Sequence, residues 1–271
     1  MPELPEVETV KNQLKKRLIG KSIKQVKINY NQVIEYPSVT NFSKNIINQE
    51  FIDIKRRGKW LIFELNDYYL LSHLRMEGKY NFRNKNDIIN KHEHIIFTLN
   101  DDIQLRYQDT RKFGKMHLIE KDKIDVVGPL IKLGLEPWDE RLDKYYLKKK
   151  YMKKSIPIKT LLLDQNIIAG IGNIYADEIL FLSNINPYTK SSQLSDNDLD
   201  NIIKNTKIIL EKAIKLGGTT IHTFSSVDGL DGKFQNELLV HGLNICPNCH
   251  NKITKEFIGG RGTYYCKNCQ K

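Results

Sequence analysis

The chain has 271 residues, of which 40% are hydrophobic and 28% charged, a composition typical of a folded globular protein with room for two domains. It contains no run of about 18 apolar residues and begins with an acidic segment, so we expect neither a membrane-spanning helix nor a secretory signal, and a cytoplasmic location. Its formal net charge of +11 favours a polyanionic partner, although charge alone does not distinguish DNA from RNA or anionic lipid.

The first half of the chain is predicted to contain one helix followed by many strands. Apolar residues at helical spacing predict an amphipathic helix from Pro5 to Leu18, ending near Gly20. Short runs rich in β-branched and aromatic residues, separated by Asn, Asp and Gly, then predict strands at residues 23–28, 51–54, 60–65, 68–74, 79–83, 94–99, 103–107 and 115–119. This series indicates a β-sandwich or flattened barrel.

The pattern changes to helices after a connector that begins near Gly128. Helices are predicted at residues 140–153, 158–163, 173–182 and 196–216. A segment with several Gly, Ser and Thr residues, 218–234, is predicted to be a mobile loop. We therefore predict an α+β chain of two lobes, with a β-sandwich domain at 1–130, a helical DNA-binding domain at 131–235 and a finger at 236–271.

The four cysteines of the chain form two C-x2-C pairs near its end, at Cys246, Cys249, Cys266 and Cys269. This spacing predicts a zinc ribbon, and two disulfides are the alternative. Because four thiolates complete a tetrahedral zinc shell, the Zn²⁺ is expected to be structural.

The first residues could form a nucleophilic centre. If Met1 is removed, the chain begins with the secondary amine of Pro2, and an α-amine with a pKa near ~8 is partly neutral at pH 7 and can attack a carbonyl carbon. Glu3 lies beside it and could transfer protons. The alternative is purely structural, because proline and acidic residues are common where a helix begins.

Six motifs that occur in order along the chain carry a resemblance to a known family. They are residues 2–9 (PELPEVET), 56–59 (RRGK), 73–78 (HLRMEG), 109–114 (DTRKFG), 170–175 (GIGNIY) and 260–266 (GRGTYYC). The chain resembles the bacterial formamidopyrimidine-DNA glycosylases of the Fpg/Nei family over its whole length. The related endonuclease VIII type usually has Gly where this chain has Leu4, which favours the purine-repair branch.

The resemblance implies a base-excision-repair DNA glycosylase and AP lyase that removes 8-oxoguanine and formamidopyrimidines from damaged double-stranded DNA. It implies an N-terminal β-sandwich and a helix–two-turn–helix lobe with a zinc finger, which clamp DNA between them. We expect a monomer.

The same resemblance implies four catalytic residues. Pro2 would attack C1′ of the damaged nucleotide to form a Schiff base, and Glu3 would donate a proton to the opening sugar. Lys59 would act near the damaged nucleotide and its phosphate, whereas Arg261 would bind a flanking phosphate and assist the second step of a β,δ-elimination. On its own, Lys59 would be interpreted as a surface lysine of a turn.

The resemblance also implies DNA contacts. Met76, Arg111 and Phe113 match the residues that fill the void left by the extruded nucleotide. Core packing is the alternative for Met76 and Phe113, but Arg111 would share a sheet face with Phe113, which argues against a core. The remaining contacts would be made by Asn173, at a Gly-rich turn that opens a helix, and by His92 and Lys154.

The chain departs from the family pattern at three positions. Many members have Lys or Arg at the position of His222 and Tyr at the position of His241. Some relatives have a small residue at the position of Glu77. His222 lies in loop 218–234 and His241 follows it; in the family this loop closes over the everted base. Two other functions are weighed: an endonuclease VIII-like glycosylase for oxidised pyrimidines, and a zinc-ribbon protein that binds damaged DNA without cutting it.

Overall fold

The computed structural model describes residues 1–151, 154–219 and 232–271. By their internal contacts, the residues form two units: Met1–Ile131 with Thr219–Gly232, and Lys132–Gly218 with Lys233–Lys271. Most of predicted loop 218–234, including His222, lies outside the described residues. No described helix is long and apolar enough to span a membrane.

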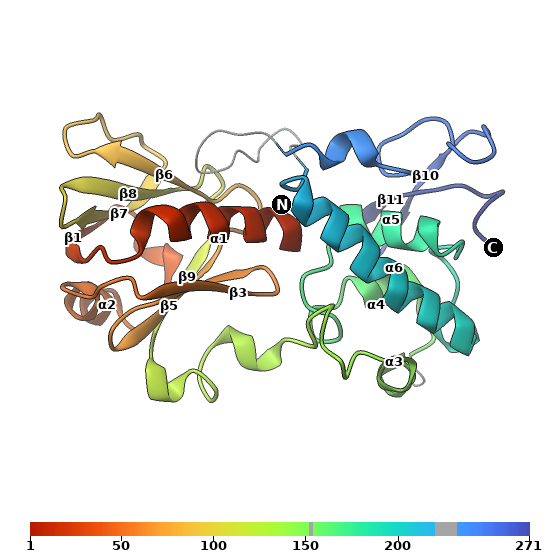
Figure 1. Cartoon of the computed structure of the whole chain (residues 1–271), viewed down its shortest axis with the longest axis horizontal. Helices are drawn as coiled ribbons and strands as arrows, with labels where there is room; N and C mark the ends of the chain where they lie inside the picture. The colour runs from red at the N-terminus through yellow and green to blue at the C-terminus, as the bar shows by residue number, and fades with distance from the viewer. Residues whose placement is uncertain (152–153, 220–231) are drawn as a thin grey trace. The chain divides into compact units, whose positions relative to one another are not determined.

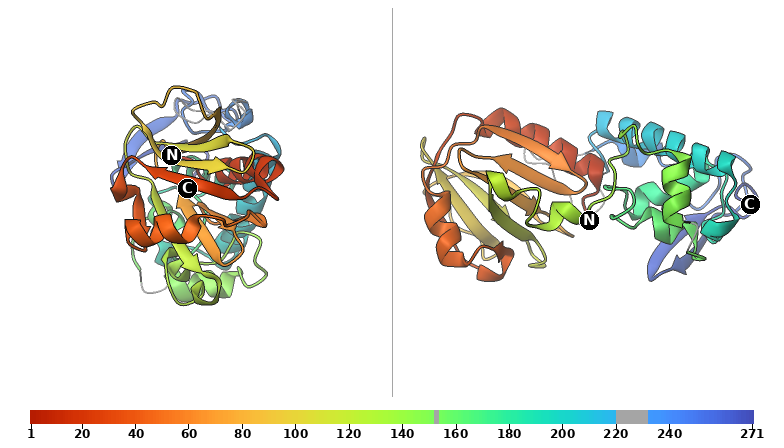
Figure 2. Two further views of the ribbon diagram at one scale, coloured as in Figure 1. Left: turned by 90° about the vertical axis from the view of Figure 1, so that its left-hand side faces the viewer. Right: turned by 90° about the horizontal axis from the view of Figure 1, so that it is seen from below.

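The first unit contains two sheets, which can be followed in Figure 1 and in two further views in Figure 2. One sheet has the strand order β1-β7-β8-β6 and the other β2-β9-β5-β4-β3. The strands are β1 (Ile23–Ile28), β2 (Ile34–Tyr36), β3 (Asp53–Arg57), β4 (Trp60–Glu64), β5 (Tyr68–His73), β6 (Lys79–Asn84), β7 (Glu93–Leu99), β8 (Ile103–Gln108) and β9 (Lys115–Glu120). The predicted β-sandwich is confirmed.

Helix α1 (Leu4–Leu18) packs against β3 and β4, and its apolar stripe joins the core between the sheets. The same core takes alternate residues of the strands, such as Phe97 of β7 and Leu105 of β8. Two short elements were not predicted, α2 (Val39–Ile46) and β2. Helix α2 begins at Ser38, whose hydroxyl accepts a hydrogen bond from the Asn41 amide.

The second unit is helical and ends in a β-hairpin. It contains α3 (Lys144–Tyr151), α4 (Ile158–Leu162), α5 (Asn173–Leu182), α6 (Asp196–Lys215), β10 (Thr254–Ile258) and β11 (Arg261–Tyr265). The described residues also form five short 3-10 turns, at Asn31–Val33, Lys121–Lys123, Pro129–Lys132, Ser191–Gln193 and Phe234–Glu237. The helix predicted at 140–153 begins later than expected, because the Asp143 carboxylate accepts the Tyr146 amide and caps α3 there.

Candidate active site and nucleic-acid interface

The N-terminus of α1 buries two carboxylates. Glu3 and Glu6 are 3% and 2% exposed, and the Glu3 amide donates to Glu6 Oε2 at 2.8 Å. The other Glu6 oxygen accepts the amide and hydroxyl of Thr219, at 2.7 and 3.1 Å. Glu6 therefore fixes both the start of α1 and the beginning of the segment after α6.

The electrostatics of this end of the chain favour a neutral amine. Burial lowers the pKa of the Met1 α-amine below its ordinary value, and Lys59 and Arg111 lower it further, while Glu3 and Glu6 raise it. The charges of three predicted site residues, Glu3, Lys59 and Arg111, therefore all act on this amine. Pro2 is itself buried.

Lys59 is only 5% exposed, in the turn between β3 and β4, so the interpretation as an ordinary surface lysine is wrong. The turn is tied to α1 by Arg56, which donates from Nε to Glu8 Oε2 at 2.8 Å and from Nη1 to the Gly58 carbonyl at 2.9 Å. Glu8 thus helps to place Lys59 near the start of α1.

Arg111 and Phe113 lie in the turn between β8 and β9, not in a strand as the shared-face argument assumed. Asp109 builds this turn: its carboxylate accepts the Arg111 amide at 3.0 Å and the Gly114 amide at 2.8 Å. Phe113 is 50% exposed, and the Arg111 guanidinium lies 5.0 Å from its ring centre. The two side chains are therefore exposed, and Phe113 is not a core residue.

Met76 lies half-buried in the turn between β5 and β6, which is braced by His73. The His73 ring accepts the Arg75 amide at Nδ1, 3.0 Å away, and packs edge-on against Trp60. Burial lowers the pKa of His73 to about 3, and Arg75 and Lys59 contribute to the shift. His73 is therefore neutral at pH 7 and can serve as this acceptor.

In the second unit, Asn173 is the first residue of α5, and its side-chain amide donates to the Gly262 carbonyl at 2.9 Å. Arg261 is exposed at the start of β11, just after Gly259 and Gly260, whose positive φ angles form the hairpin turn. Lys154 is partly exposed, 3.4 Å from Asp164. Asn173 and Arg261 are thus brought together through the neighbouring Gly262.

A buried ion pair that the sequence did not reveal holds the same hairpin. Lys159 and Asp177 are both fully buried, with Nζ 2.7 Å from Oδ1. Lys159 also donates to the Gly262 carbonyl and to Thr263 Oγ1, while Asp177 Oδ2 accepts the Tyr264 amide at 3.1 Å and lies 2.7 Å from His241 Nδ1. His241 therefore pairs with Asp177 inside the unit.

The sulfur atoms of the four cysteines all lie within 4.8 Å of one another. The Cys246–Cys269 and Cys249–Cys266 sulfur pairs are 3.8 and 3.5 Å apart, too far for disulfides and close to the edge of a tetrahedron with Zn–S bonds of about 2.3 Å. The donor set fits one structural Zn²⁺ with no position left for water.

Three family models match the chain: the formamidopyrimidine-DNA glycosylase N-terminal domain at residues 1–116, the formamidopyrimidine-DNA glycosylase H2TH domain at 133–225, and the zinc finger found in FPG and IleRS at 245–271. The formamidopyrimidine-DNA glycosylase of Shouchella clausii is 44% identical, over 100% of this chain and 99% of its own. The chain belongs to the formamidopyrimidine-DNA glycosylase family.

Other family members are similar to this chain over most or all of their length. The formamidopyrimidine-DNA glycosylase of Mycoplasma genitalium is 45% identical, over 100% of this chain and 96% of its own. The Lactococcus lactis Fpg in complex with DNA that contains an abasic site has 39% identity and a TM-score of 0.93, with each chain fully covered. The wild-type L. lactis Fpg bound to DNA containing N7-benzyl-Fapy-dG has 40% identity and a TM-score of 0.92, again with each chain fully covered. The predicted formamidopyrimidine-DNA glycosylase family and fold class are therefore confirmed.

Proposed function

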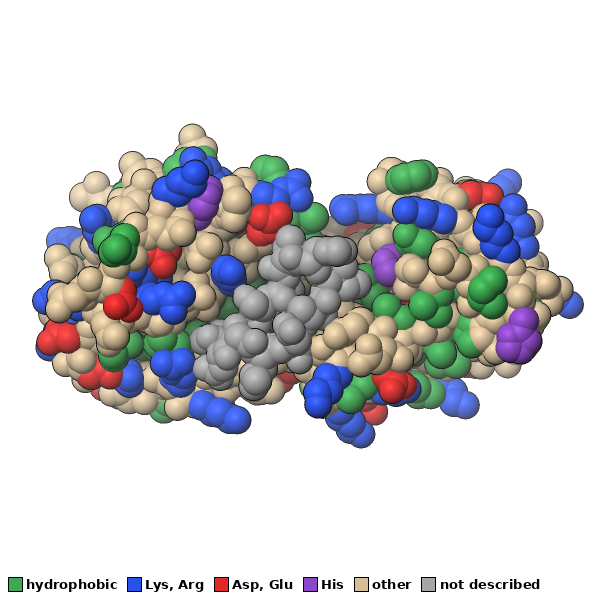
Figure 3. Space-filling model, turned by 90° about the horizontal axis from the view of Figure 1, so that it is seen from above, with side chains coloured by type: hydrophobic (Ala, Val, Ile, Leu, Met, Phe, Trp, Pro, Cys, Tyr) green, Lys and Arg blue, Asp and Glu red, His purple; other side chains and the backbone are tan. Residues whose placement is uncertain are grey.

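We propose that this chain is a DNA glycosylase and AP lyase that removes oxidised purines, 8-oxoguanine and formamidopyrimidines, from duplex DNA. The observation that carries the proposal is the start of α1, where Glu3 and Lys59 are buried and burial lowers the pKa of the Met1 α-amine, whose place as the chain's terminal amine Pro2 takes once Met1 is removed. Family members bound to abasic and Fapy-dG-containing DNA support the substrate class. The Lys and Arg side chains, drawn blue in Figure 3, contribute to a net positive charge that favours binding to the phosphates of DNA.

The mechanism uses the residues at the start of the chain. After loss of Met1, the Pro2 nitrogen attacks C1′ while the bond to the damaged base breaks, and Glu3 protonates the sugar oxygen as the ring opens. The iminium withdraws electrons, so that a C2′ proton is lost and the 3′ phosphate departs; a second elimination releases the 5′ phosphate and leaves a one-nucleoside gap. Lys59 and Arg261 bind the phosphates and assist these steps.

The remaining site residues bind DNA. Met76, Arg111 and Phe113 fill the void left by the extruded nucleotide. His92 and Lys154 contact DNA, and Asn173 binds a phosphate. Cys246, Cys249, Cys266 and Cys269 hold Zn²⁺, which stabilises the finger that carries Arg261. The enzyme acts as a cytoplasmic monomer, with the catalytic domain at 1–130, the helical domain at 131–235 and the finger at 236–271.

The test is borohydride trapping on a duplex with a single 8-oxoguanine opposite cytosine, followed by mass mapping of the cross-link. We expect a reduced adduct on Pro2 and none with Pro2→Gly, which serves as the matched control. Tight lesion binding without any adduct would indicate a reader of damage rather than an enzyme. Faster processing of a matched thymine glycol duplex would instead assign the enzyme to oxidised pyrimidines.

A further inference from the structure

Strands β6 and β7 are joined by an unusual connection. Both pair with β8 in the antiparallel sense, on opposite sides, so they run parallel to each other. The chain must therefore return along β8 from one end of the sheet to the other. Parallel crossovers are usually made by a helix of a dozen or more residues, whereas residues 85–92, here called the crossover segment, contain no helix or strand.

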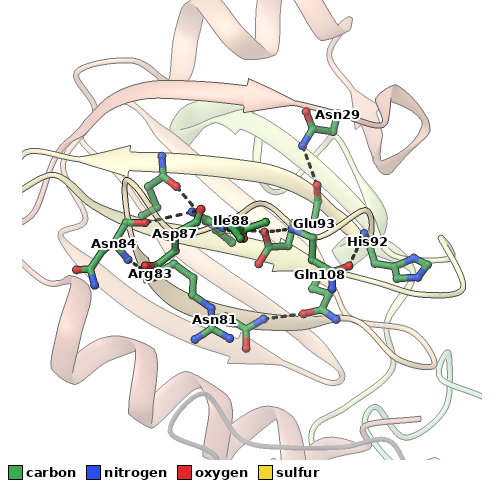
Figure 4. Close-up of polar contacts among 12 residues, drawn as sticks. Asn29, Asn81, Arg83, Asn84, Asp87, Ile88, His92, Glu93 and Gln108 are labelled. Carbon is green, nitrogen blue, oxygen red and sulfur yellow. Dashed lines mark hydrogen bonds and ion pairs between the residues drawn. The ribbon is translucent and has the colours of Figure 1, made fainter.

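The crossover segment lies on the outer face of the sheet, where Gln104, Arg106 and Gln108 of β8 point away from the core residues Leu105 and Tyr107. Figure 4 shows it passing from Asn84 through Asp87 and Ile88 to His92. An irregular segment over a sheet leaves main-chain carbonyls that need hydrogen-bond donors.

Arg106 provides these donors. Its side chain is fully buried, and its guanidinium donates to the carbonyls of Asn84, Asp87 and Ile88 at 2.8–3.1 Å. It also donates to Gln104 Oε1 and to Glu93 Oε2, each at 2.9 Å. All five N–H groups of the guanidinium are therefore used, two of them on the crossover segment and one on Asn84, the last residue of β6.

The hydrogen bonds continue from Arg106 to His92. Glu93 Oε2, the ion-pair partner of Arg106, also accepts the Asn90 amide at 2.9 Å. The Asn90 side chain accepts the His92 amide at 2.9 Å, and the His92 carbonyl accepts the Asp109 amide at 3.0 Å. The backbone of His92 is thus fixed on both sides, whereas Nδ1 of its ring is buried and has no hydrogen-bond partner among the described residues.

We propose that Arg106 is a positioning residue of the DNA interface: it holds the crossover segment on the sheet and thereby sets where His92 meets a phosphate. The inference rests on the proposed function through the role of His92. The exposed charges of the segment are Lys85, Asp87 and Lys91, and their net positive charge favours the same partner.

The test is a double-mutant cycle between Arg106→Lys and His92→Ala, read as Kd for a duplex with a non-cleavable abasic analogue at fixed salt. Lysine keeps the charge of Arg106 but has three donors in place of five. Each single variant is expected to weaken binding roughly tenfold, the loss expected for one charged hydrogen bond. The double variant is expected to bind no more weakly than the single variant with the larger loss of affinity. Losses that multiply to about a hundredfold would overturn the inference.

Hydrogen exchange tests the structural half without DNA. In Arg106→Lys, the amides of Asn90 and His92 should exchange at least about tenfold faster while those of the sheet core keep their protection. Unchanged protection of both amides would overturn the inference. The matched control is Arg83→Lys, an exposed arginine of β6, which should change neither measurement.

If Arg106→Lys does not fold, Asn90→Ala takes its place in the cycle, because Asn90 is exposed and its side chain accepts the His92 amide, while its main-chain amide donates to Glu93. Asn90→Ala should then make the effect of His92→Ala smaller, and independent effects would refute the inference.

Trapping of the wild-type enzyme on lesion DNA separates the two proposals. Absence of trapping rejects the proposed function, whereas trapping with multiplicative losses rejects only the role of Arg106.

Discussion

The charge of Asp177 should determine the stability of the second unit. Asp177 and Lys159 are both fully buried and 2.7 Å apart, and no water can replace either partner. Asp177→Asn keeps the shape of the side chain but leaves a buried ammonium without its counter-charge. Breaking a buried pair in this way costs about 3–5 kcal/mol, which should lower the Tm of a unit of this size by roughly 10 °C or more.

The same substitution should change the chemistry, because Lys159 and Asp177 both bind the strand that begins with Arg261. With the strand loosened, the proposed δ-elimination should slow more than the β-elimination. Gel analysis of the cleaved strand would then show accumulation of the β-elimination product, which retains the sugar fragment. Loss of both eliminations in equal proportion would contradict this positioning of Arg261.

Calorimetry of the intact protein tests the energetic part. Asp200→Asn is the matched control, because Asp200 forms an exposed pair with Lys144 at 3.3 Å, of a kind worth at most about 1 kcal/mol. Combining Asp177→Asn with Lys159→Met removes the unpaired cation and should restore much of the lost Tm. A Tm for Asp177→Asn equal to that of the wild type would refute the reasoning.

Three further predictions concern other parts of the protein. In Gly114→Ala the new Cβ would lie 1.6 Å from the Tyr107 hydroxyl, so the turn of Arg111 should distort, and titration of lesion duplex should show weaker binding. The pKa of His73 is about 3 in the folded state and near 6.5 when unfolded. The free energy of unfolding should therefore decrease as the pH is lowered from 6.5 to 3, by up to about 1.4 kcal/mol per pH unit. Urea unfolding of His73→Gln should show that the substitution removes this pH dependence. Cys266→Ser should reduce bound zinc in metal analysis and lower the Tm of the second unit, and unchanged zinc content would contradict the four-cysteine site.

Local patterns predicted most of the secondary structure because they depend on neighbours in the sequence. The alternation in β7 and β8 and the helical spacing in α1 follow directly from which side chains face the core. The two C-x2-C pairs needed only their own spacing. Short elements and exact boundaries were not predicted. The three residues of β2 are too few to show a periodic pattern. The start of α3 is set by a single capping aspartate, Asp143.

The buried charges could not be predicted in the same way. Arg106 alternates with Leu105 and Tyr107, so its position in the sequence indicates a solvent-facing side chain. It is covered by the crossover segment and by Glu93, which come from other parts of the chain. Lys159 is similar, since its partner Asp177 and its acceptor Gly262 lie far away along the chain. Long-range contacts of this kind leave no periodic signal in a single sequence.

Three buried carboxylates lie beside residues that we propose to contact DNA. Glu93 follows His92, Asp109 accepts the amide of Arg111, and Asp177 accepts an amide of the strand that Arg261 begins. Long exposed side chains lose conformational entropy when they bind, and a fixed backbone limits that loss to the side chain itself. Substitution of the buried partner should therefore weaken DNA binding about as much as substitution of the contact residue, although the buried residue never touches DNA.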